Sequence, residues 1–212
     1  LGPGPIPSTA ARKAVAWLIK KPVSTLYGRL EQLAQSLAPE LDREVAFEKS
    51  GETMQIDLRV LDLLHDGLLH VVRNSLDHGG ESVEEREAKG KPGPITIRLA
   101  ADILESGMAH IAISDDGKGI NVAAVKKRAI ERGLVDEVAA NKLADQEVIQ
   151  FIFLPGFSTK DEVTDVSGRG VGMEVLKNVV EKDLHGEVQL QSTEGQGTRI
   201  ELIFSLNALI SF

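Results

Sequence analysis

Apolar and polar residues alternate along several segments of this chain, and such segments are predicted to be β-strands. The segments are PITIRLAAD (94–102), MAHIAISDD (108–116), EVQLQS (187–192) and TRIELIFSL (198–206). Because successive side chains of a strand point to opposite faces, each strand has one apolar face and one polar face. Strands of this kind form a sheet that helices cover on one side only. The sequence therefore predicts an α/β fold, a two-layer sandwich.

Helices to cover that sheet are predicted from apolar residues at a spacing near 3.6. The longest spans about residues 57–78, and two short β-like runs, EVAFEK (44–49) and TMQID (53–57), precede it. The remaining helices are predicted at 23–37, 122–133, 145–154 and 171–182. A charged loop, GGESVEEREAKGKPGP (79–94), follows the long helix.

Composition excludes several classes of protein. The chain has 212 residues, a formal net charge of −8 and no cysteine. The negative charge argues against binding to nucleic acid through bulk electrostatics, and the absence of cysteine excludes disulfides and thiolate metal sites. No run of about 18 apolar residues is present, so we expect no insertion into a membrane.

The long helix carries polar groups beside its apolar stripe. His70, Asn74 and His78 recur at intervals of four residues and therefore lie along one side of the helix. For a single histidine or asparagine, a solvated helix face is the better interpretation. Three such groups in register weaken that interpretation and favour a binding surface.

A first glycine-rich motif, SDDGKGI (114–120), joins a strand to a helix. Gly117 and Gly119 allow the backbone to turn tightly and to approach a ligand closely. Asp115 stands at the end of the strand, where a carboxylate can accept a hydrogen bond from an exocyclic amine. A plain strand-to-helix connection explains this motif equally well.

A second motif, SGRGVGMEVLKNVVEKD (167–183), places Gly168, Gly170 and Gly172 before a helix. Free N–H groups and the positive end of a helix dipole favour an anion there, so this segment is a candidate phosphate cradle. Glycines in this spacing also occur in flexible loops. The segment 151–167, between the two motifs, is interpreted as a mobile cover over a ligand, with an ordinary surface loop as the alternative.

The order of these motifs resembles a known superfamily. HVVRNSLDHG (70–79), the DxGxG of 115–119, GxGxG before a helix and EGQGT before the last strand resemble the ATP-binding domains shared by histidine kinases, gyrase, Hsp90 and MutL. FLPGFSTKDEVTDVSGRGVGM (153–173) and TEGQGTRIEL (193–202) are closer still to chemotaxis histidine kinases of the CheA family. The resemblance covers roughly residues 40–206, and it implies a Bergerat-type sandwich with a mixed sheet that binds ATP and Mg²⁺. One departure is Gly80, which stands before Glu81 where the family usually has a bulky apolar residue, and we expect it to leave that turn looser.

The resemblance also implies residue roles. Asn74 is expected to be a Mg²⁺ ligand, and His70 takes the position of a glutamate that activates water in ATPases of the superfamily. His70 is therefore expected to support the metal or accept a proton, and Asp115 is expected to bind the adenine amino group with help from Thr198. Lys127 and Arg128 are candidate cations for phosphates, with a solvated helix face equally plausible for either. The implied ATP-binding residues are Asn74, His78, Asp115, Gly117, Gly119, Lys127, Arg128, Ser158, Thr159, Gly168, Arg169, Gly170, Val171, Gly172, Met173 and Thr198.

By the same resemblance, the chain is expected to be a cytoplasmic protein histidine kinase. It would transfer the γ-phosphoryl group of ATP to a histidine on a separate phosphotransfer domain, with response regulators downstream. We expect residues 1–39 to be a linker and helical segment, 40–207 the catalytic domain, and 208–212 the start of a truncated receptor-coupling region. Two alternatives are an ATP-hydrolysing member of the superfamily and a nucleotide-sensing scaffold without catalysis.

Overall fold

The computed structural model describes residues 20–157 and 172–206. A mixed sheet has the strand order β2-β4-β5-β7-β6. Its strands are β2 (Val45–Ser50), β4 (Ile95–Ile103), β5 (Ala109–Asp115), β6 (Glu187–Thr193) and β7 (Gly197–Phe204). Strand β2 is parallel to β4, and the other neighbouring pairs are antiparallel. The alternating segments of the sequence therefore form the strands that they predict.

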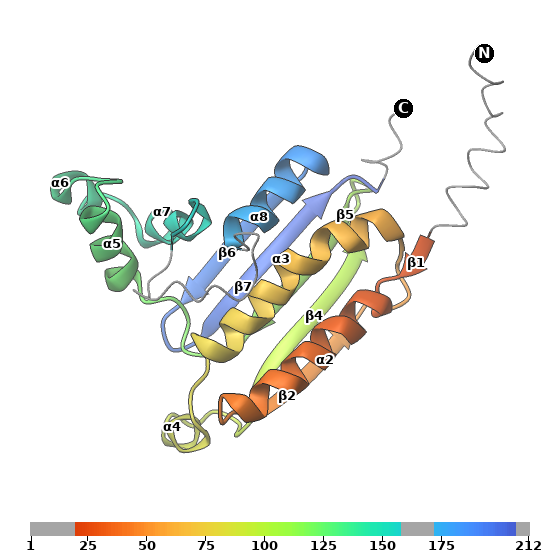
Figure 1. The fold of residues 1–212 in the computed structure, drawn as a ribbon, viewed down its shortest axis with the longest axis horizontal. Coiled ribbons are helices and arrows are strands. Elements are labelled where there is room, and N and C mark those ends of the chain that lie inside the picture. Colours follow the sequence, from red (N-terminus) through yellow and green to blue (C-terminus); the bar gives the residue numbers. More distant parts are fainter. Residues whose placement is uncertain (1–19, 158–171, 207–212) are drawn as a thin grey trace, which may run out of the picture.

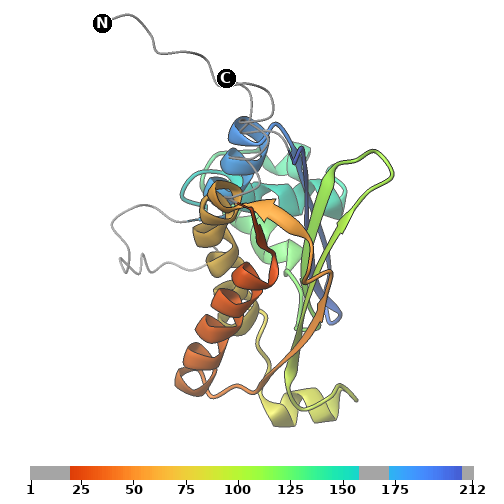
Figure 2. The ribbon, with the colours of Figure 1, turned by 90° about the vertical axis from the view of Figure 1, so that its right-hand side faces the viewer.

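Helices cover one face of this sheet. Figure 1 shows α2 (Ser24–Glu40), α3 (Leu58–Asp77) and α8 (Met173–Asn178) in front of the strands, and Figure 2 shows helices and sheet as two layers. Residues Ile97, Ile111 and Leu202 of the covered face are buried with the apolar side of α3. The predicted two-layer α/β sandwich is confirmed.

Helix α3 follows the prediction closely because its sequence specifies both ends and one face. The side chain of Asp57 accepts a hydrogen bond from the Arg59 backbone N–H at 2.8 Å, which caps the helix. His78 is the C-terminal cap residue. The buried residues of α3 are Val60, Leu61, Leu64, Gly67, Leu68, Val71, Val72, Ser75 and Leu76. The apolar stripe thus turns the other side of the helix, with His70 and Asn74, away from the core.

The short elements differ from the prediction. Segment 44–49 pairs with β4, whereas β3 (Gln55–Asp57) pairs with β1 (Lys20–Pro22), so the two β-like runs join different sheets. The charged loop contains helix α4 (Val83–Ala88), whose start is a capping box between Ser82 and Glu85. Outside these segments, the other short helices are α5 (Val122–Glu131), α6 (Glu137–Ala140), α7 (Asp145–Val148) and the 3₁₀ turn Ile149–Phe153.

The last helix is also shorter than predicted. Helix α8 ends at Asn178 and continues as a π-helical turn, Val179–Asp183, in which the Leu184 N–H donates to the Val179 carbonyl at 3.0 Å. At the other end of the chain, Leu26, Tyr27 and Leu30 of α2 belong to the same buried core as α3. Residues 20–39, expected to precede the catalytic domain, therefore share its core. None of the described helices is long and apolar enough to cross a membrane.

Candidate functional site

The candidate site is centred on Asp115, the last residue of β5. The residue is only 8% exposed. The Ser75 hydroxyl of α3 donates to Oδ2 at 2.8 Å, and the Gly117 backbone N–H donates to Oδ1 at 3.0 Å. Thr198 is the partner of Asp115 across the β5–β7 pair. Helix, strand and glycine loop therefore converge on one carboxylate.

Burial raises the pKa of the Asp115 carboxyl above its ordinary value, because the charged form loses solvation. Hydrogen bonds from Ser75, Gly117 and Thr198 oppose that increase. A carboxylate has about four lone-pair sites, so these three donors leave acceptor capacity for a ligand. A buried acceptor of this kind suits an exocyclic amine, and it penalises a ligand that offers no donor at that position.

The glycines of SDDGKGI are required by the packing of the protein itself. A Cβ atom on Gly117 would lie 2.4 Å from the Gly79 carbonyl oxygen, and one on Gly119 would lie 2.4 Å from that of Thr193. Gly119 also has a φ of +70°, a conformation that side chains disfavour. The Lys118 N–H donates to the Gly79 carbonyl at 2.9 Å. The loop is therefore fixed between the end of α3 and the β6–β7 strands.

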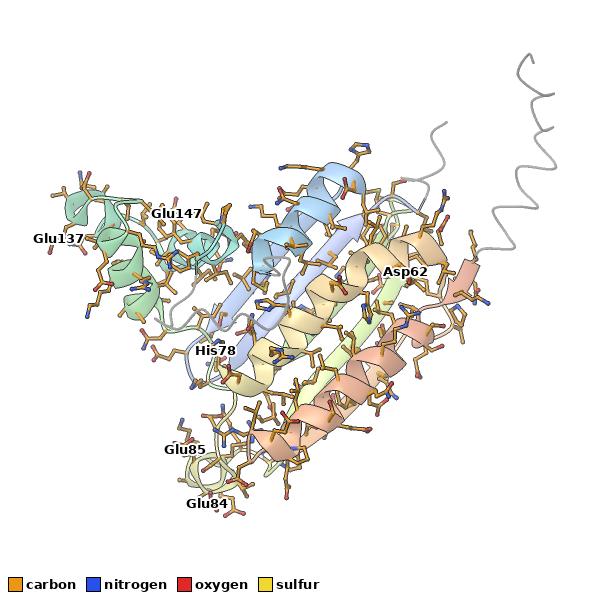
Figure 3. The ribbon with its side chains drawn as sticks, in the orientation of Figure 1. Asp62, His78, Glu84, Glu85, Glu137 and Glu147 are labelled. Atoms are coloured by element: carbon orange, nitrogen blue, oxygen red, sulfur yellow. The ribbon has the colours of Figure 1, made fainter. Side chains whose placement is uncertain are left out.

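The C-terminal end of α3 lies next to this loop, because Gly79, which follows the helix, accepts from Lys118. His70 and Asn74 are half-buried, and the His78 label in Figure 3 marks the end of the helix. The pKa of His70 is lowered, first by burial and then by the positive charges of Arg73 and His78. His70 is therefore a neutral imidazole at neutral pH, which can accept a proton or donate a lone pair.

An ion cluster not expected from the sequence lies beneath the loop. Arg86 is fully buried, and its guanidinium contacts the carboxylates of Glu81 at 3.4 Å and Asp116 at 2.9 Å. Lys89 and Lys91 also pair with Glu81, at 2.6 and 2.7 Å. Burial of Glu81 disfavours its charge, but hydrogen bonds from both lysines outweigh that effect and lower its pKa. Figure 3 labels Glu84 and Glu85, the acidic neighbours of Arg86 in α4.

This cluster corrects one expectation. The turn after α3 was expected to be loose because Gly80 precedes Glu81. Both residues are buried. A Cβ atom on Gly80 would lie 2.1 Å from the Leu76 carbonyl oxygen, so glycine is there because the turn is tight.

The other residues predicted to bind ATP lie on α5, at the start of α8, or outside the described residues. Lys127 and Arg128 lie on α5 and pair with Glu131 of the same helix at 3.8 and 3.6 Å. Gly172 is the extended residue before α8, and Met173 is the buried first residue of that helix. The remaining candidates lie outside the described residues, and their roles stay predictions: Ser158, Thr159, Gly168, Arg169, Gly170 and Val171.

Sequence reasoning missed Ser75 and Ser192. The Ser192 hydroxyl accepts from the Ile120 N–H at 2.9 Å and lies 3.1 Å from the Thr198 hydroxyl, so it joins the loop to β7. Ser75 could have been found, because it continues the apolar stripe of Leu64, Leu68 and Val71. A hydroxyl at a core position of a helix needs a buried partner. Here the Val71 carbonyl lies at 3.2 Å and the Asp115 carboxylate is closer, at 2.8 Å.

These residues fit ATP with Mg²⁺. Asp115 offers a buried acceptor for the base, and the half-buried Asn74 offers a neutral amide oxygen for a metal. Among the described residues, no group of three or more His, Cys, Asp or Glu could hold a metal ion. Mg²⁺ commonly takes one or two protein ligands and completes its shell with phosphate oxygens and water. The donor set therefore fits a metal that arrives with the triphosphate.

Comparison with known proteins agrees with this site. The chain belongs to the family described as histidine kinase-, DNA gyrase B- and HSP90-like ATPases, which it matches over residues 60–208. The solved catalytic domain of the histidine kinase ThkA has the same fold. That likeness covers 89% of this chain and 97% of the other, with a TM-score of 0.56 at 14% sequence identity.

Within the family, the chain is CheA-like. It is 39% identical over 190 residues to chemotaxis protein CheA of Bacillus subtilis, which covers 89% of this chain and 28% of that protein. It is 41% identical over 189 residues to chemotaxis protein CheA of Borreliella burgdorferi, again 89% of this chain and 21% of that protein. The chain therefore spans about a quarter of the length of these relatives.

Proposed function

We propose that this domain binds Mg²⁺–ATP and transfers its γ-phosphoryl group to a histidine on a separate phosphotransfer domain, in chemotaxis-type two-component signalling. The proposal rests on one observation: Ser75 of α3 and Gly117 of the glycine loop both donate to the buried Asp115 carboxylate. One helix thus supports the base site through Ser75 and carries His70 and Asn74 on its partly exposed side. CheA-like similarity over most of the chain supports the same function.

In the proposed mechanism, Asp115 accepts a hydrogen bond from the adenine amino group, with Thr198 beside it. Asn74 holds the metal that accompanies the phosphates, and His78 contacts a phosphate oxygen. Bound Mg²⁺ supplies neutralisation of phosphate charge. The protein therefore contributes mainly position and electrostatics, as is general for phosphoryl transfer.

His70 favours transfer over rapid hydrolysis. Its lowered pKa keeps the imidazole neutral, but nearby phosphates favour the protonated form and make it a weak permanent base. In the proposal it supports the metal or assists proton transfer during the reaction with the acceptor histidine.

The partners follow from the same proposal. The acceptor is a histidine phosphotransfer domain of the same or a partner kinase, and response regulators act downstream. A receptor-coupling region controls the reaction from outside this domain. All of these components, and the domain itself, are proposed to be cytoplasmic.

The test is phosphotransfer from labelled ATP to a supplied phosphotransfer domain. The parent domain is expected to label the acceptor, and Asn74→Ala is expected to abolish labelling while retaining much of the ATP affinity. Asn141→Ala is the matched control, because Asn141 is an exposed residue after α6. Labelling by Asn74→Ala at the parent rate would contradict the assignment of α3. Steady-state phosphate release without an acceptor would instead indicate an ATPase.

A further inference from the structure

The peptide unit between Asp116 and Gly117 links the ion cluster to Asp115. Its N–H, on Gly117, donates to Asp115 Oδ1 at 3.0 Å. Its carbonyl oxygen, on Asp116, accepts from Lys91 Nζ at 2.9 Å and from Arg86 Nη1 at 3.3 Å. A peptide unit is planar and its N–H and C=O point in opposite directions in the trans form. The cluster therefore holds one side of the unit that donates to Asp115 from the other side.

Lys91 contacts two consecutive carbonyl groups of this loop. Its ammonium group also donates to the Gly117 carbonyl at 2.8 Å and pairs with Glu81 at 2.7 Å, which accounts for its three donors. Its side chain is 16% exposed. Glu81 Oε2 accepts from both Lys91 and Arg86, so Arg86 holds the carboxylate that pairs with this ammonium group. Asp116 Oδ1 accepts from the Thr96 N–H at 2.9 Å. The loop is thereby anchored to β4 as well.

We propose that Lys91 is a positioning residue for recognition of the adenine base. It clamps the Asp116–Gly117 peptide, so that the Gly117 N–H continues to donate to Asp115 and keeps the carboxylate in its orientation. This inference rests on the proposed function, because it takes Asp115 as the residue that binds the exocyclic amine. Lys91 contacts the loop and not the nucleotide. Its loss therefore weakens selectivity for the base and leaves the phosphate side of the site in place.

Lys91→Met tests the clamp with little change in side-chain length. Variants of Glu81 or Arg86 are less suitable, because each residue takes part in several ion pairs of the buried cluster and its loss would disturb all of them at once. Lys89→Met is the matched control. Lys89 pairs with the same Glu81 at 2.6 Å, and its side chain is 52% exposed, so the variant removes the same charge without altering the described contacts of Lys91 with the loop.

The measurement is calorimetric affinity for ATP and for inosine triphosphate, which carries a carbonyl oxygen in place of the exocyclic amine. In the parent, ATP is expected to bind more tightly than inosine triphosphate. Lys91→Met is expected to lower the ratio of the two affinities by about tenfold, the effect of one charge-assisted hydrogen bond, mainly through weaker ATP binding. Lys89→Met is expected to keep the parent ratio. A purely structural loss would weaken both nucleotides equally.

The two possible failures are distinguishable. If the parent shows no preference for ATP over inosine triphosphate, the assignment of Asp115 and the clamp fail together. If the parent prefers ATP and Lys91→Met keeps the full ratio, or loses no more of it than Lys89→Met, the clamp alone is overturned. Should Lys91→Met not fold, Lys91→Gln is measured in the same way. Its amide can replace only part of the contact, so a ratio equal to that of the parent would overturn the inference.

Discussion

At the scale of single residues, Ser75 occupies a core position of α3, and its hydroxyl donates a hydrogen bond to Asp115. Without that donor, the buried carboxylate would be less well solvated, and its pKa would rise further. The raised pKa of Asp115 means that burial of its charge costs stability as the pH increases through that pKa. Ser75 reduces this cost only where the carboxyl is ionised.

Ser75→Ala is therefore expected to destabilise the domain by about 1–3 kcal/mol at pH 7, and by less as the pH falls and Asp115 takes up a proton. Urea unfolding at a series of pH values measures this. Ser36→Ala is the control, because the Ser36 hydroxyl donates to the Leu33 carbonyl in an exposed part of α2. A loss that is the same at every pH would show that Ser75 does not act through the charge of Asp115.

His70 gives a second prediction at this scale. Its pKa lies below the ordinary value of 6.5, so the imidazole is neutral at and above that pH and gains a proton only at lower pH. The kcat/KM for ATP, which reports groups of the nucleotide-free domain, is expected to decline through this group only as the pH falls below 6.5. His70→Ala is expected to lower the rate by about 100-fold with little loss of nucleotide affinity. An unchanged rate in the variant would remove His70 from the mechanism.

At the scale of secondary-structure elements, the position of α8 depends on Gly67 of α3. A Cβ atom at Gly67 would lie 2.8 Å from Leu176 Cβ and 3.1 Å from its Cα, so the helices cross too closely for any side chain there. By contrast, Gly28 of α2 is exposed, and a Cβ atom there has nothing within 4 Å. The two glycines lie in comparable helices but in opposite environments.

Gly67→Ala is expected to destabilise the domain by about 1–3 kcal/mol, because the added methyl group must displace Leu176 or its helix. Gly28→Ala is expected to stabilise it by about 0.5–1 kcal/mol, because alanine favours a helix without a clash. Urea unfolding of the two variants gives both values. Stabilisation by Gly67→Ala would contradict the close crossing of α3 and α8.

At the scale of the whole molecule, the sequence predicted what depends on local periodicity. The alternating strands and the stripe of α3 recur at fixed intervals, so their burial could be inferred. The parallel pairing of β2 with β4 could not, because the pairing depends on segments about 50 residues apart. The pattern also gave no sign that Glu81, Arg86 and Lys91 are a buried cluster, since charged residues in a loop are ordinarily solvated.

The same distinction applies to the site. Asp115, Asn74 and His70 were predicted from motifs, and the Ser75 hydroxyl joins Asp115 to the helix that carries the other two. Ser75, Ser192 and Lys91 were missed, because they act by holding the loop and the strand in place. Whether the glycines before α8 bind phosphates remains a prediction, since most of that motif lies outside the described residues.

The central claim is that a nucleotide binds with its base against Asp115, and calorimetry of Asp115→Asn with ATP and with ADP tests it most directly. Asparagine keeps the size but replaces an acceptor oxygen with an amide that donates. Affinity for both nucleotides is expected to fall equally, by about 1–3 kcal/mol, because both carry adenine. Asp62→Asn is the control, at an exposed position of α3 labelled in Figure 3 that pairs with Arg29. Unchanged affinity of the folded Asp115→Asn variant for ATP would contradict the account.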